Sequence, residues 1–305
     1  MKCLIVYNPF SGKQKFEKYK DYVIDVLKQK YETIDVYSSQ APKSIISKVT
    51  TIGEFYDFIM VCGGDGTLNE VVNGLMNLPK EKRPKIGYVP CGTVNDVGHL
   101  LKLKNNYKKA VELFLNEDAQ EVDLCKALDR YFIYATALGK FTDVSYATSK
   151  KLKKVFGKLA YYLQSVISFF KNEKIELEAT LDDGRVIKGK YYVVLGLNSS
   201  RVAGYFLYRK VKNKINDGRI DLTLVKQKIF PLNFINLALF FIFGDRWKHG
   251  VDTYQTSKIH FKTNDLVSYN IDGEFAWKAK DMTVEVIPSA IKIIVSKEVK
   301  EKHFI

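Results

Sequence analysis

The sequence has few cysteines, and their spacing excludes several common uses of this residue. The four cysteines are Cys3, Cys62, Cys91 and Cys125, and no two of them form a CxxC pair. Most lie in or beside short apolar runs that are typical of buried strands. We therefore expect small, apolar, reduced side chains in an intracellular protein and no disulfide framework.

Long apolar runs are also scarce. The N-terminal run ends at Asn8 and Pro9, which is too short for the apolar core of a signal peptide. The most apolar stretch, 229–243, contains a proline and two asparagines, and it falls short of the roughly 20 residues that a membrane-spanning helix needs. These features predict a cytoplasmic protein that contacts membranes peripherally without crossing them.

Positive charge, in contrast, is abundant. Lys and Arg number 48 against 34 Asp and Glu, so the net charge is 48 − 34 = +14. This excess favours anionic partners such as nucleotides, an anionic membrane surface or nucleic acid, without choosing among them. With 46% hydrophobic and 27% charged residues in 305 positions, the chain is expected to fold into about two globular domains. The histidines share no metal-ligand spacing.

Up to residue 124, short apolar runs alternate with helical patterns. Strands are expected at 2–7, 33–37, 57–62 and 85–89, and helices at 15–30, 45–52 and 67–77. This alternation predicts an α/β domain with a mostly parallel sheet. Ligands bind beyond the carboxyl ends of such strands, so the loops 8–13, 63–67 and 90–96 should share one rim.

After residue 124 the pattern changes to strands and turns. Strands are expected at 130–137, 175–181, 186–197, 219–225, 257–261 and 283–287, and helices at 148–172 and 231–243. Asp183-Gly184 and Asp217-Gly218 supply turn signals. The pattern predicts a second, mainly antiparallel β domain over 125–305, with a tight cleft between the two domains.

The loop after the third predicted strand has the composition of a phosphate site. It reads Gly63-Gly64-Asp65-Gly66-Thr67 and leads into a predicted helix. Glycines let backbone N–H groups turn toward an anion, and the helix N-terminus adds partial positive charge. Asp65 would repel a bare phosphate, so Mg²⁺ or a phosphate acceptor is expected between them. Taken alone, the loop also fits an ordinary strand–helix turn.

Two further polar loops favour the phosphate interpretation. Asn8 to Lys13 follow the first predicted strand, and Gly92, Thr93, Asn95 and Asp96 follow the fourth. Three such loops on one rim are hard to explain as turns alone. The GxxxxGK[ST] spacing is absent, so this is not a P-loop.

The three loops together resemble the catalytic domain of the diacylglycerol kinase and lipid kinase family, which includes sphingosine and ceramide kinases. The similarity is greatest to its soluble bacterial branch. The resemblance implies a phosphofructokinase-like α/β domain over 1–124 and a β-sandwich domain over 125–305, whose C-terminal tail is able to pack back on the first. It also implies Mg-ATP-dependent phosphorylation of diacylglycerol or a similar lipid alcohol, with the active site between the domains.

The resemblance also implies site residues. The catalytic base is implied at Asp272 or Glu274, although Asp272-Gly273 alone reads as a hairpin turn. ATP contacts are implied at Asn8, Ser11, Gly12, Lys13, Ser39, Gly63, Gly64, Asp65, Gly66, Thr67, Asn69, Glu70, Gly92, Thr93 and Asn95. Catalytic Mg²⁺ is implied at Asp65, Asp96 and Asp123 through water, and a structural Mg²⁺ at Asp217 and the backbone of Lys214 and Arg219.

One position departs from the family pattern. Many relatives carry an aromatic residue and then an arginine after the Asn-Asp pair, whereas here Val97-Gly98-His99 follow. A phosphate contact from that arginine is therefore not expected.

Two surface features bear on membranes. Lysines crowd the start of the predicted helix 148–172, which suits docking on an anionic leaflet or a solvated end of a core helix. The phenylalanines of 230–243 are expected in the core in preference to a groove for lipid access.

Other functions were weighed against a lipid kinase. NAD kinases share a GGDGT-like loop, so a kinase of NAD or a sugar phosphate is the closest alternative, but 8–13 and 272–274 favour the lipid branch. A nucleotide-binding membrane-surface protein without catalysis is the alternative from another class. No nucleic-acid motif is present. A homodimer is expected only because it is the commonest oligomer.

Overall fold

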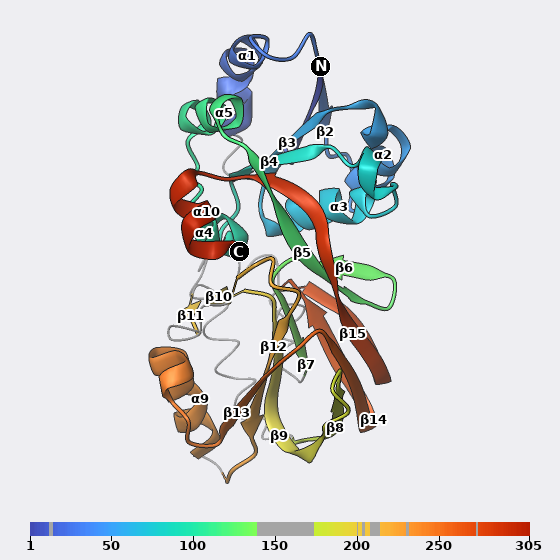
Figure 1. Ribbon diagram of the computed structural model, residues 1–305, viewed down its shortest axis with the longest axis vertical. Coiled ribbons are helices and arrows are strands. Elements are labelled where there is room, and N and C mark those ends of the chain that lie inside the picture. The colour runs from blue at the N-terminus through green and yellow to red at the C-terminus, as the bar shows by residue number, and fades with distance from the viewer. Residues whose placement is uncertain are drawn as a thin grey trace.

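The computed structural model of the chain describes residues 1–11, 15–138, 174–199, 201–202, 205–207, 214–229, 232–272 and 274–305. Strands and helices alternate in its first half, which is the upper part of Figure 1. In chain order these are β1 (Lys2–Tyr7), α1 (Lys15–Leu27), β2 (Thr33–Ser38), α2 (Ser44–Ile52), β3 (Phe58–Gly63), α3 (Asp65–Leu75), β4 (Lys85–Pro90), α4 (Asp96–Leu100) and α5 (Tyr107–Asn116). The expected alternation is therefore present, with α4 and α5 added.

The strands of this half form a parallel sheet in the order β4-β3-β1-β2. Side chains along a strand alternate between the two faces. Leu4 and Val6 accordingly lie in one buried cluster, and Cys3 and Ile5 lie in the other. Because both faces are covered, these strands appear in the sequence as continuous apolar runs.

Helices cover both faces of the parallel sheet. α2 and α3 lie on one face, and α1 and α5 lie on the other (Figure 1). α2 and α3 approach closely at Gly74, where a Cβ would lie 2.7 Å from the Cβ of Val49. β1 has β2 on one side and β3 on the other, so the order in which successive strands are added to the sheet reverses at β1. Such a switch point leaves a crevice beyond the carboxyl ends of β1 and β3.

The second half is built mainly from strands. Its elements are β5 (Ala119–Ala127), β6 (Arg130–Phe132), β7 (Ala135–Leu138), β8 (Ile175–Leu181), β9 (Val186–Leu197), β10 (Arg201–Val202), β11 (Tyr205–Phe206), β12 (Ile220–Lys226), α9 (Leu232–Phe243), β13 (Val251–Thr256), β14 (Lys258–Ile271), β15 (Glu274–Ile294) and α10 (Lys297–His303). Within the described part, every pairing among these strands is antiparallel. The expected antiparallel character is therefore present.

β15 joins the two halves into one sheet. Near its end Ile293 pairs in parallel with Ile86 of β4, whereas its first part pairs with β14 in the second half. β5 runs antiparallel to β15 from Ala119 to Ala127. Figure 1 shows β15, in red, passing from the lower half to the upper half.

Several predicted elements differ from those observed. The strand expected at 130–137 is two strands, β6 and β7, because Ile133 and Tyr134 turn their N–H groups to the carboxylate of Asp272. The strands expected at 257–261 and 283–287 are parts of the long β14 and β15. The helix expected at 148–172 lies outside the described residues.

No helix among the described residues is long and apolar enough to cross a membrane. All four cysteines are buried and free.

The tail after β15 contacts both halves, and Glu298 of α10 pairs with Lys102 of the first half. Val299 and Phe304 are buried in the cluster that contains Leu4 and Val6. The Lys214 Nζ donates to the carbonyl oxygen of Phe304 at 2.7 Å and also contacts the last carbonyls of α10. Cations at a helix C-terminus satisfy these carbonyls and oppose the helix dipole.

We expect Phe304→Ala to lower the free energy of unfolding by about 3–5 kcal/mol, because it removes a buried ring and leaves a cavity. Phe304 is 3% exposed, while the next residue, Ile305, is 83% exposed. Ile305→Ala is therefore a matched control that should change stability by less than about 0.5 kcal/mol. Urea unfolding of both variants tests this, and equal losses would contradict the packing described here.

Candidate active site

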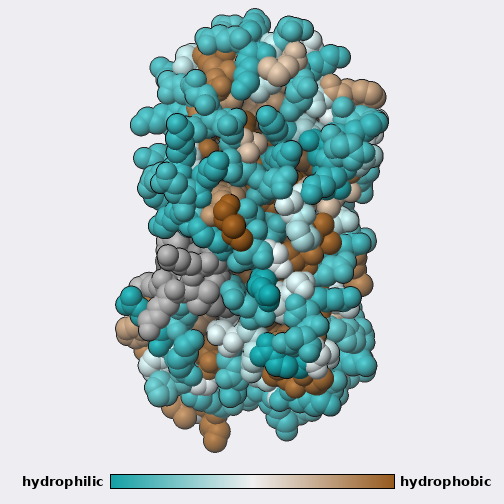
Figure 2. Space-filling view, in the orientation of Figure 1, coloured by the Kyte–Doolittle hydropathy of each residue, from teal (hydrophilic) through white to brown (hydrophobic). Residues whose placement is uncertain are grey.

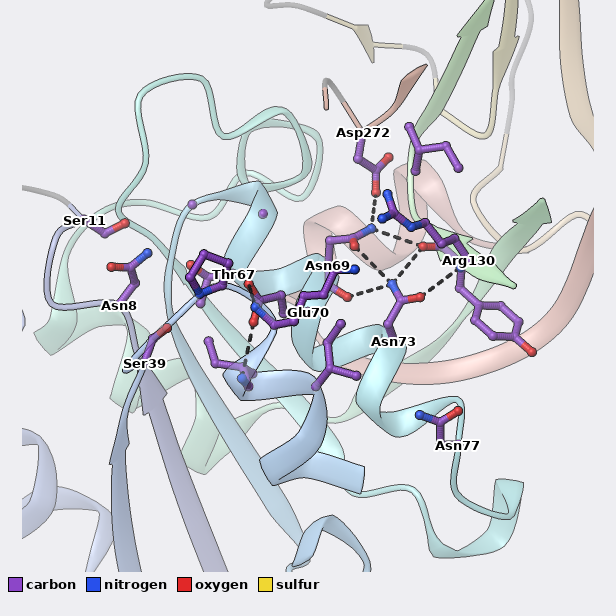
Figure 3. A pocket seen from close by; sticks show the side chains of 18 of the residues that line it. Asn8, Ser11, Ser39, Thr67, Asn69, Glu70, Asn73, Asn77, Arg130 and Asp272 are labelled. Atoms are coloured by element: carbon purple, nitrogen blue, oxygen red, sulfur yellow. Dashed lines mark hydrogen bonds between the residues drawn. The ribbon is translucent and has the colours of Figure 1, made fainter. Parts of the chain in front are cut away.

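A cavity of about 540 Å³ lies at the crevice beyond β1 and β3 (Figure 3). Its wall comes from the loops after β1 and β3, the first turns of α3, the start of α2, β6 and the end of β14. Among the predicted site residues, those that line it are Asn8, Ser11, Ser39, Gly64, Gly66, Thr67, Asn69, Glu70 and Asp272. The fold thus brings residues of both halves to one cavity.

The loop after β4 packs behind the glycine loop and does not line the cavity. A Cβ on Gly92 would lie 2.6 Å from the Cα of Gly64, so the two loops approach backbone to backbone. Asn95 has a φ of 53° and holds this loop by accepting from the Gly92 N–H and donating to its carbonyl, both at 2.8 Å. Gly92 therefore packs against the glycine loop and Asn95 holds the Gly92 loop in shape, and none of Gly92, Thr93 and Asn95 lines the cavity. Gly12 and Lys13 lie outside the described residues.

Asp65 ties these two loops together. Its Oδ2 accepts the N–H of Asp96 at 3.1 Å, and its Oδ1 accepts the N–H of Val97 at 3.4 Å. Burial raises the pKa of Asp65 to about 6, the two N–H donors oppose this, and the carboxylates of Asp96 and Asp272 add to it. The carboxylate therefore caps the start of α4 at the base of the glycine loop.

Glu70 connects α3 to the start of α2. Its Oε1 accepts the N–H of Lys43 at 3.1 Å, and its Oε2 accepts the N–H of Ile45 at 3.3 Å. A carboxylate at this position satisfies N–H groups that a helix N-terminus leaves without partners. Glu70 thereby fixes the wall of the cavity that Ser39 also lines.

The Asp272 carboxylate is fully engaged by N–H donors. Oδ1 accepts from the backbones of Tyr134 and Ala135, both at 3.1 Å. Oδ2 accepts from the backbone of Ile133 at 3.0 Å and from the Asn69 side chain at 2.9 Å. A carboxylate offers about four lone-pair positions. Burial raises the pKa of Asp272 to about 6, although all four donors favour the charged form.

Asn69 and Asn73 form an amide bridge from α3 to β6 (Figure 3). Asn73 Nδ2 donates to the Asn69 Oδ1 at 3.0 Å and to the Tyr131 carbonyl at 2.9 Å. Asn73 Oδ1 accepts the Tyr131 N–H at 3.0 Å. Asn69 in turn donates to Asp272. The helix that follows the glycine loop is therefore bonded directly to the acidic turn of the other half.

The predicted metal residues fall in two places. Asp65 and Asp96 lie at the glycine loop, whereas Asp123 accepts the N–H of Gly218 at 2.7 Å and of Ser289 at 2.8 Å. Asp123 therefore lies beside the turn that contains Asp217. Nowhere in the described ranges do three or more His, Cys, Asp or Glu gather as a metal site.

The Asp217 turn is closed by its own backbone. Asp217 accepts the N–H groups of Arg219 at 3.0 Å and Lys214 at 3.3 Å. Burial raises the pKa of Asp217, and the nearby Asp123 carboxylate adds to the increase.

The carboxylates near the glycine loop suit a hard divalent cation. The carboxylates of Asp96 and Asp272 add to the burial that raises the pKa of Asp65, so these acidic groups lie near one another at the glycine loop. Mg²⁺ commonly keeps several waters and binds one or two carboxylates together with substrate phosphates. The residues therefore fit such an ion.

Sequence reasoning missed ten residues of the cavity wall, and four of them, Asn73, Asn77, Arg130 and Tyr131, bear on the chemistry of the site. Asn69, Asn73 and Asn77 recur every four residues, which places them on one face of a helix. That spacing could have identified the two additional asparagines. Arg130 had no local signal, because its position depends on the pairing of β6 with β5.

Asn73→Ala should lower the free energy of unfolding by about 1–3 kcal/mol, because it leaves the N–H of Tyr131 without its partner and removes the bridge to Asn69. Asn77→Ala is the matched control, since Asn77 is exposed and bonds only the Thr50 hydroxyl among the contacts described. Its effect should stay within about 0.5 kcal/mol. Similar losses in urea unfolding for both variants would argue against the bridge.

The raised pKa of Asp65 predicts a pH-dependent contribution to stability. Its folded pKa of about 6 exceeds the unfolded value near 3.9, so the folded state holds the proton more tightly between these values. The unfolding free energy of the native protein should therefore fall, relative to Asp65→Asn, as pH rises from 4 to 6, by on the order of 1–3 kcal/mol.

Urea unfolding in metal-free buffer at several pH values measures this difference. Asp182→Asn is the control, because hydrogen bonds from Ser257 lower the pKa of Asp182 to about 2. Its contribution increases slightly just above the unfolded pKa and is then constant, so the difference for Asp182→Asn should not fall between pH 4 and pH 6. A constant difference for Asp65→Asn would contradict the prediction.

Comparisons with known proteins agree with this geometry. Residues 2–127 match the family described as the diacylglycerol kinase catalytic domain. A diacylglycerol kinase from Staphylococcus carnosus (strain TM300) is 33% identical over 305 residues, covering 99% of this chain and 97% of that protein.

Two solved structures share the fold. A diacylglycerol kinase from Bacillus anthracis str. Sterne superposes with a TM-score of 0.80 and 24% identity, covering 98% of each chain. A yeast NADH kinase complexed with NADH has a TM-score of 0.56 and 12% identity, covering 98% of this chain and 84% of that one. At these identities the structures show a common fold alone.

The curated relative matches almost the full length of both proteins, and the family match covers all three polar loops. The assignment from the loop motifs is therefore confirmed: the chain belongs to the diacylglycerol kinase catalytic domain family of lipid kinases.

Proposed function

We propose that this protein transfers the γ-phosphoryl group of Mg-ATP to the hydroxyl of diacylglycerol or a similar lipid alcohol, giving a phosphatidic-acid-like product. One observation carries the proposal. Residues of the glycine loop and the first strand loop line the same cavity as Asp272, which comes from the other half of the chain. A nucleotide phosphate and an acceptor hydroxyl can therefore meet there.

The nucleotide phosphates would lie at the start of α3. Gly64, Gly66 and Thr67 line the cavity where the helix begins, so the positive end of the helix dipole lies at the cavity. Asn8 and Ser11 add polar side chains from the first loop, and Arg130 adds a cation from β6. Phosphoryl transfer depends mainly on such positioning and charge neutralisation.

The acceptor proton needs a base near the cavity. In the proposed step the lipid oxygen bonds the γ-phosphorus, the bond to the bridging oxygen of ADP breaks, and the hydroxyl proton moves to a carboxylate. All four lone-pair positions of Asp272 accept N–H groups, which supports Asp272 as the positioning residue and Glu274 as the base.

When bound, Mg²⁺ would supply positive charge that offsets the charge of the nucleotide phosphates. Asp65 and Asp96 are the residues that would hold it, through water. Asp123 would also contact this ion through water, and its carboxylate accepts the N–H of Gly218 in the turn that contains Asp217. The second, structural Mg²⁺ would lie at that turn.

We also propose the finer arrangement expected from the family resemblance. The chain would divide into a phosphofructokinase-like domain over 1–124 and a β-sandwich domain over 125–305. β5 itself runs across this boundary. The protein would be cytoplasmic and would contact anionic membranes peripherally. A homodimer stays a prediction.

The direct test incubates purified protein with Mg-ATP and separate dispersions of diacylglycerol, phosphatidylglycerol, sphingosine and ceramide, and with NAD. A phosphorylated lipid, lost on chelation of Mg²⁺, is the expected result. Phosphorylation of NAD and of no lipid alcohol would overturn the proposal in favour of a soluble-substrate kinase.

Two variants separate the roles of the acidic turn. Glu274→Gln should lower kcat by about 10²–10⁴-fold while ATP binding survives. Asp272→Asn should lower both kcat and the free energy of unfolding, because an amide nitrogen would face two of the N–H donors that now meet an oxygen.

Asp265→Asn is the control, because Asp265 is an exposed residue on β14. This substitution should leave kcat and the free energy of unfolding unchanged. If Glu274→Gln retained full turnover, a base at that position would be excluded.

A further inference from the structure

Helix α9 has its polar and apolar faces reversed relative to an ordinary surface helix. Its sequence, LNFINLALFFIF, contains Asn233 and Asn236 as its only polar residues, and both are buried. Leu232, Ile235, Ile242 and Phe243 are exposed instead, at 53%, 46%, 56% and 46%. A helix on the surface of a water-soluble domain normally shows the opposite pattern.

The two asparagines are fixed in the second half by hydrogen bonds. Asn233 Oδ1 accepts the N–H of Lys228, and Asn236 Oδ1 accepts the indole N–H of Trp247 at 2.7 Å. Leu237 and Phe240 are buried on the same inner side. The orientation of α9 is therefore set by specific contacts, and the apolar residues are left outside as a consequence.

The exposed residues form one continuous stripe. Positions 232, 235 and 242 lie along one face of the helix, and the half-buried Leu239 continues that face between 235 and 242. Ile229, 81% exposed, precedes the helix, and the Phe243 ring stacks on Trp247 at its end. Figure 2 shows brown surface at the lower left edge, where Figure 1 places α9, on a face that is otherwise mostly hydrophilic.

The charges around the stripe are positive. Arg246 and Lys248 are exposed just beyond the end of α9, and Lys228 lies before its start. Two acidic residues of this region do not offset that positive charge. Asp245 is buried, and the Asp252 carboxylate pairs with the Lys226 ammonium at 3.0 Å. Apolar residues, an aromatic pair and a basic rim are the combination that binds the interface of an anionic bilayer.

We infer that the outer face of α9, with Ile229 and the basic residues 228, 246 and 248, docks on the surface of an anionic phospholipid bilayer. The helix lies in the interface with its stripe among the acyl chains, and its twelve residues do not span the bilayer. This inference rests on the proposed function only in that a lipid kinase must reach a substrate held in a bilayer.

The test uses the full-length protein and two kinds of vesicle: pure phosphatidylcholine, and equal parts of phosphatidylcholine and phosphatidylglycerol. Co-sedimentation should favour the anionic vesicles. The double variant Ile235→Ser/Ile242→Ser should weaken vesicle binding by on the order of tenfold or more. Arg246→Gln/Lys248→Gln should reduce only the preference for the anionic vesicles.

Leu266→Ser is the matched control. Leu266 is also exposed but lies on β14, away from α9, so its substitution should leave binding unchanged. Equal binding by Ile235→Ser/Ile242→Ser and the native protein would overturn the inference. So would a dimer in solution that this double variant converts to a monomer, because the stripe would then be a contact between two copies.

A second measurement does not require changes to the helix. Trp277→Phe leaves Trp247 as the one tryptophan of the chain. Its fluorescence should shift to the blue on addition of anionic vesicles and be quenched by brominated acyl chains. If the protein co-sedimented with the vesicles but its Trp247 emission did not change, the membrane contact would lie away from α9 and the inference would be overturned.

Kinase assays keep this inference separate from the proposed function. Ile235→Ser/Ile242→Ser should phosphorylate a short-chain diacylglycerol in solution at the native rate and long-chain diacylglycerol in vesicles more slowly. If the native protein bound vesicles through α9 but phosphorylated no lipid, the inference would stand and the proposed function would fail.

Discussion

The Asp272 carboxylate is the contact on which the arrangement of the site depends. It accepts two backbone N–H groups from the segment between β6 and β7, one from the first residue of β7 and one side-chain N–H from α3. One buried charge thus fixes the end of β14, the break between two strands and the helix behind the glycine loop. Removing the carboxylate would leave its N–H donors buried without hydrogen-bond partners. The hydrogen bonds of this network are therefore expected to be kept or lost together.

The cavity has two kinds of wall, and the Asp272 network joins them. One wall belongs to the parallel sheet, whose switch point leaves N–H groups and polar loops facing the crevice. The other belongs to the antiparallel half, which contributes Arg130 and Asp272. Asn69 and Asn73 connect them. The two walls are therefore joined by hydrogen bonds within the chain itself.

Local patterns in the sequence were sufficient for β1 to β4 and α1 to α3 of the first half, because period-two and helical spacing are set by neighbouring residues, but they did not predict α4 and α5. They were also sufficient for the family, because the three loops are short and contiguous. They could not reveal the break at Ile133 and Tyr134, since its cause lies at Asp272, far along the chain. The position of Asp123 beside Gly218 likewise depends on a distant turn.

The pairing of β5 with β15 has a mechanical consequence. Both strands run from one half of the molecule into the other, so the halves are joined by an antiparallel ribbon and not by a flexible linker. A ribbon of this kind resists bending in the plane of its hydrogen bonds, but it accommodates changes of twist. We expect opening and closing of the cleft to occur as torsion about the ribbon axis, with the two walls rotating past each other and no hinge residue absorbing the motion.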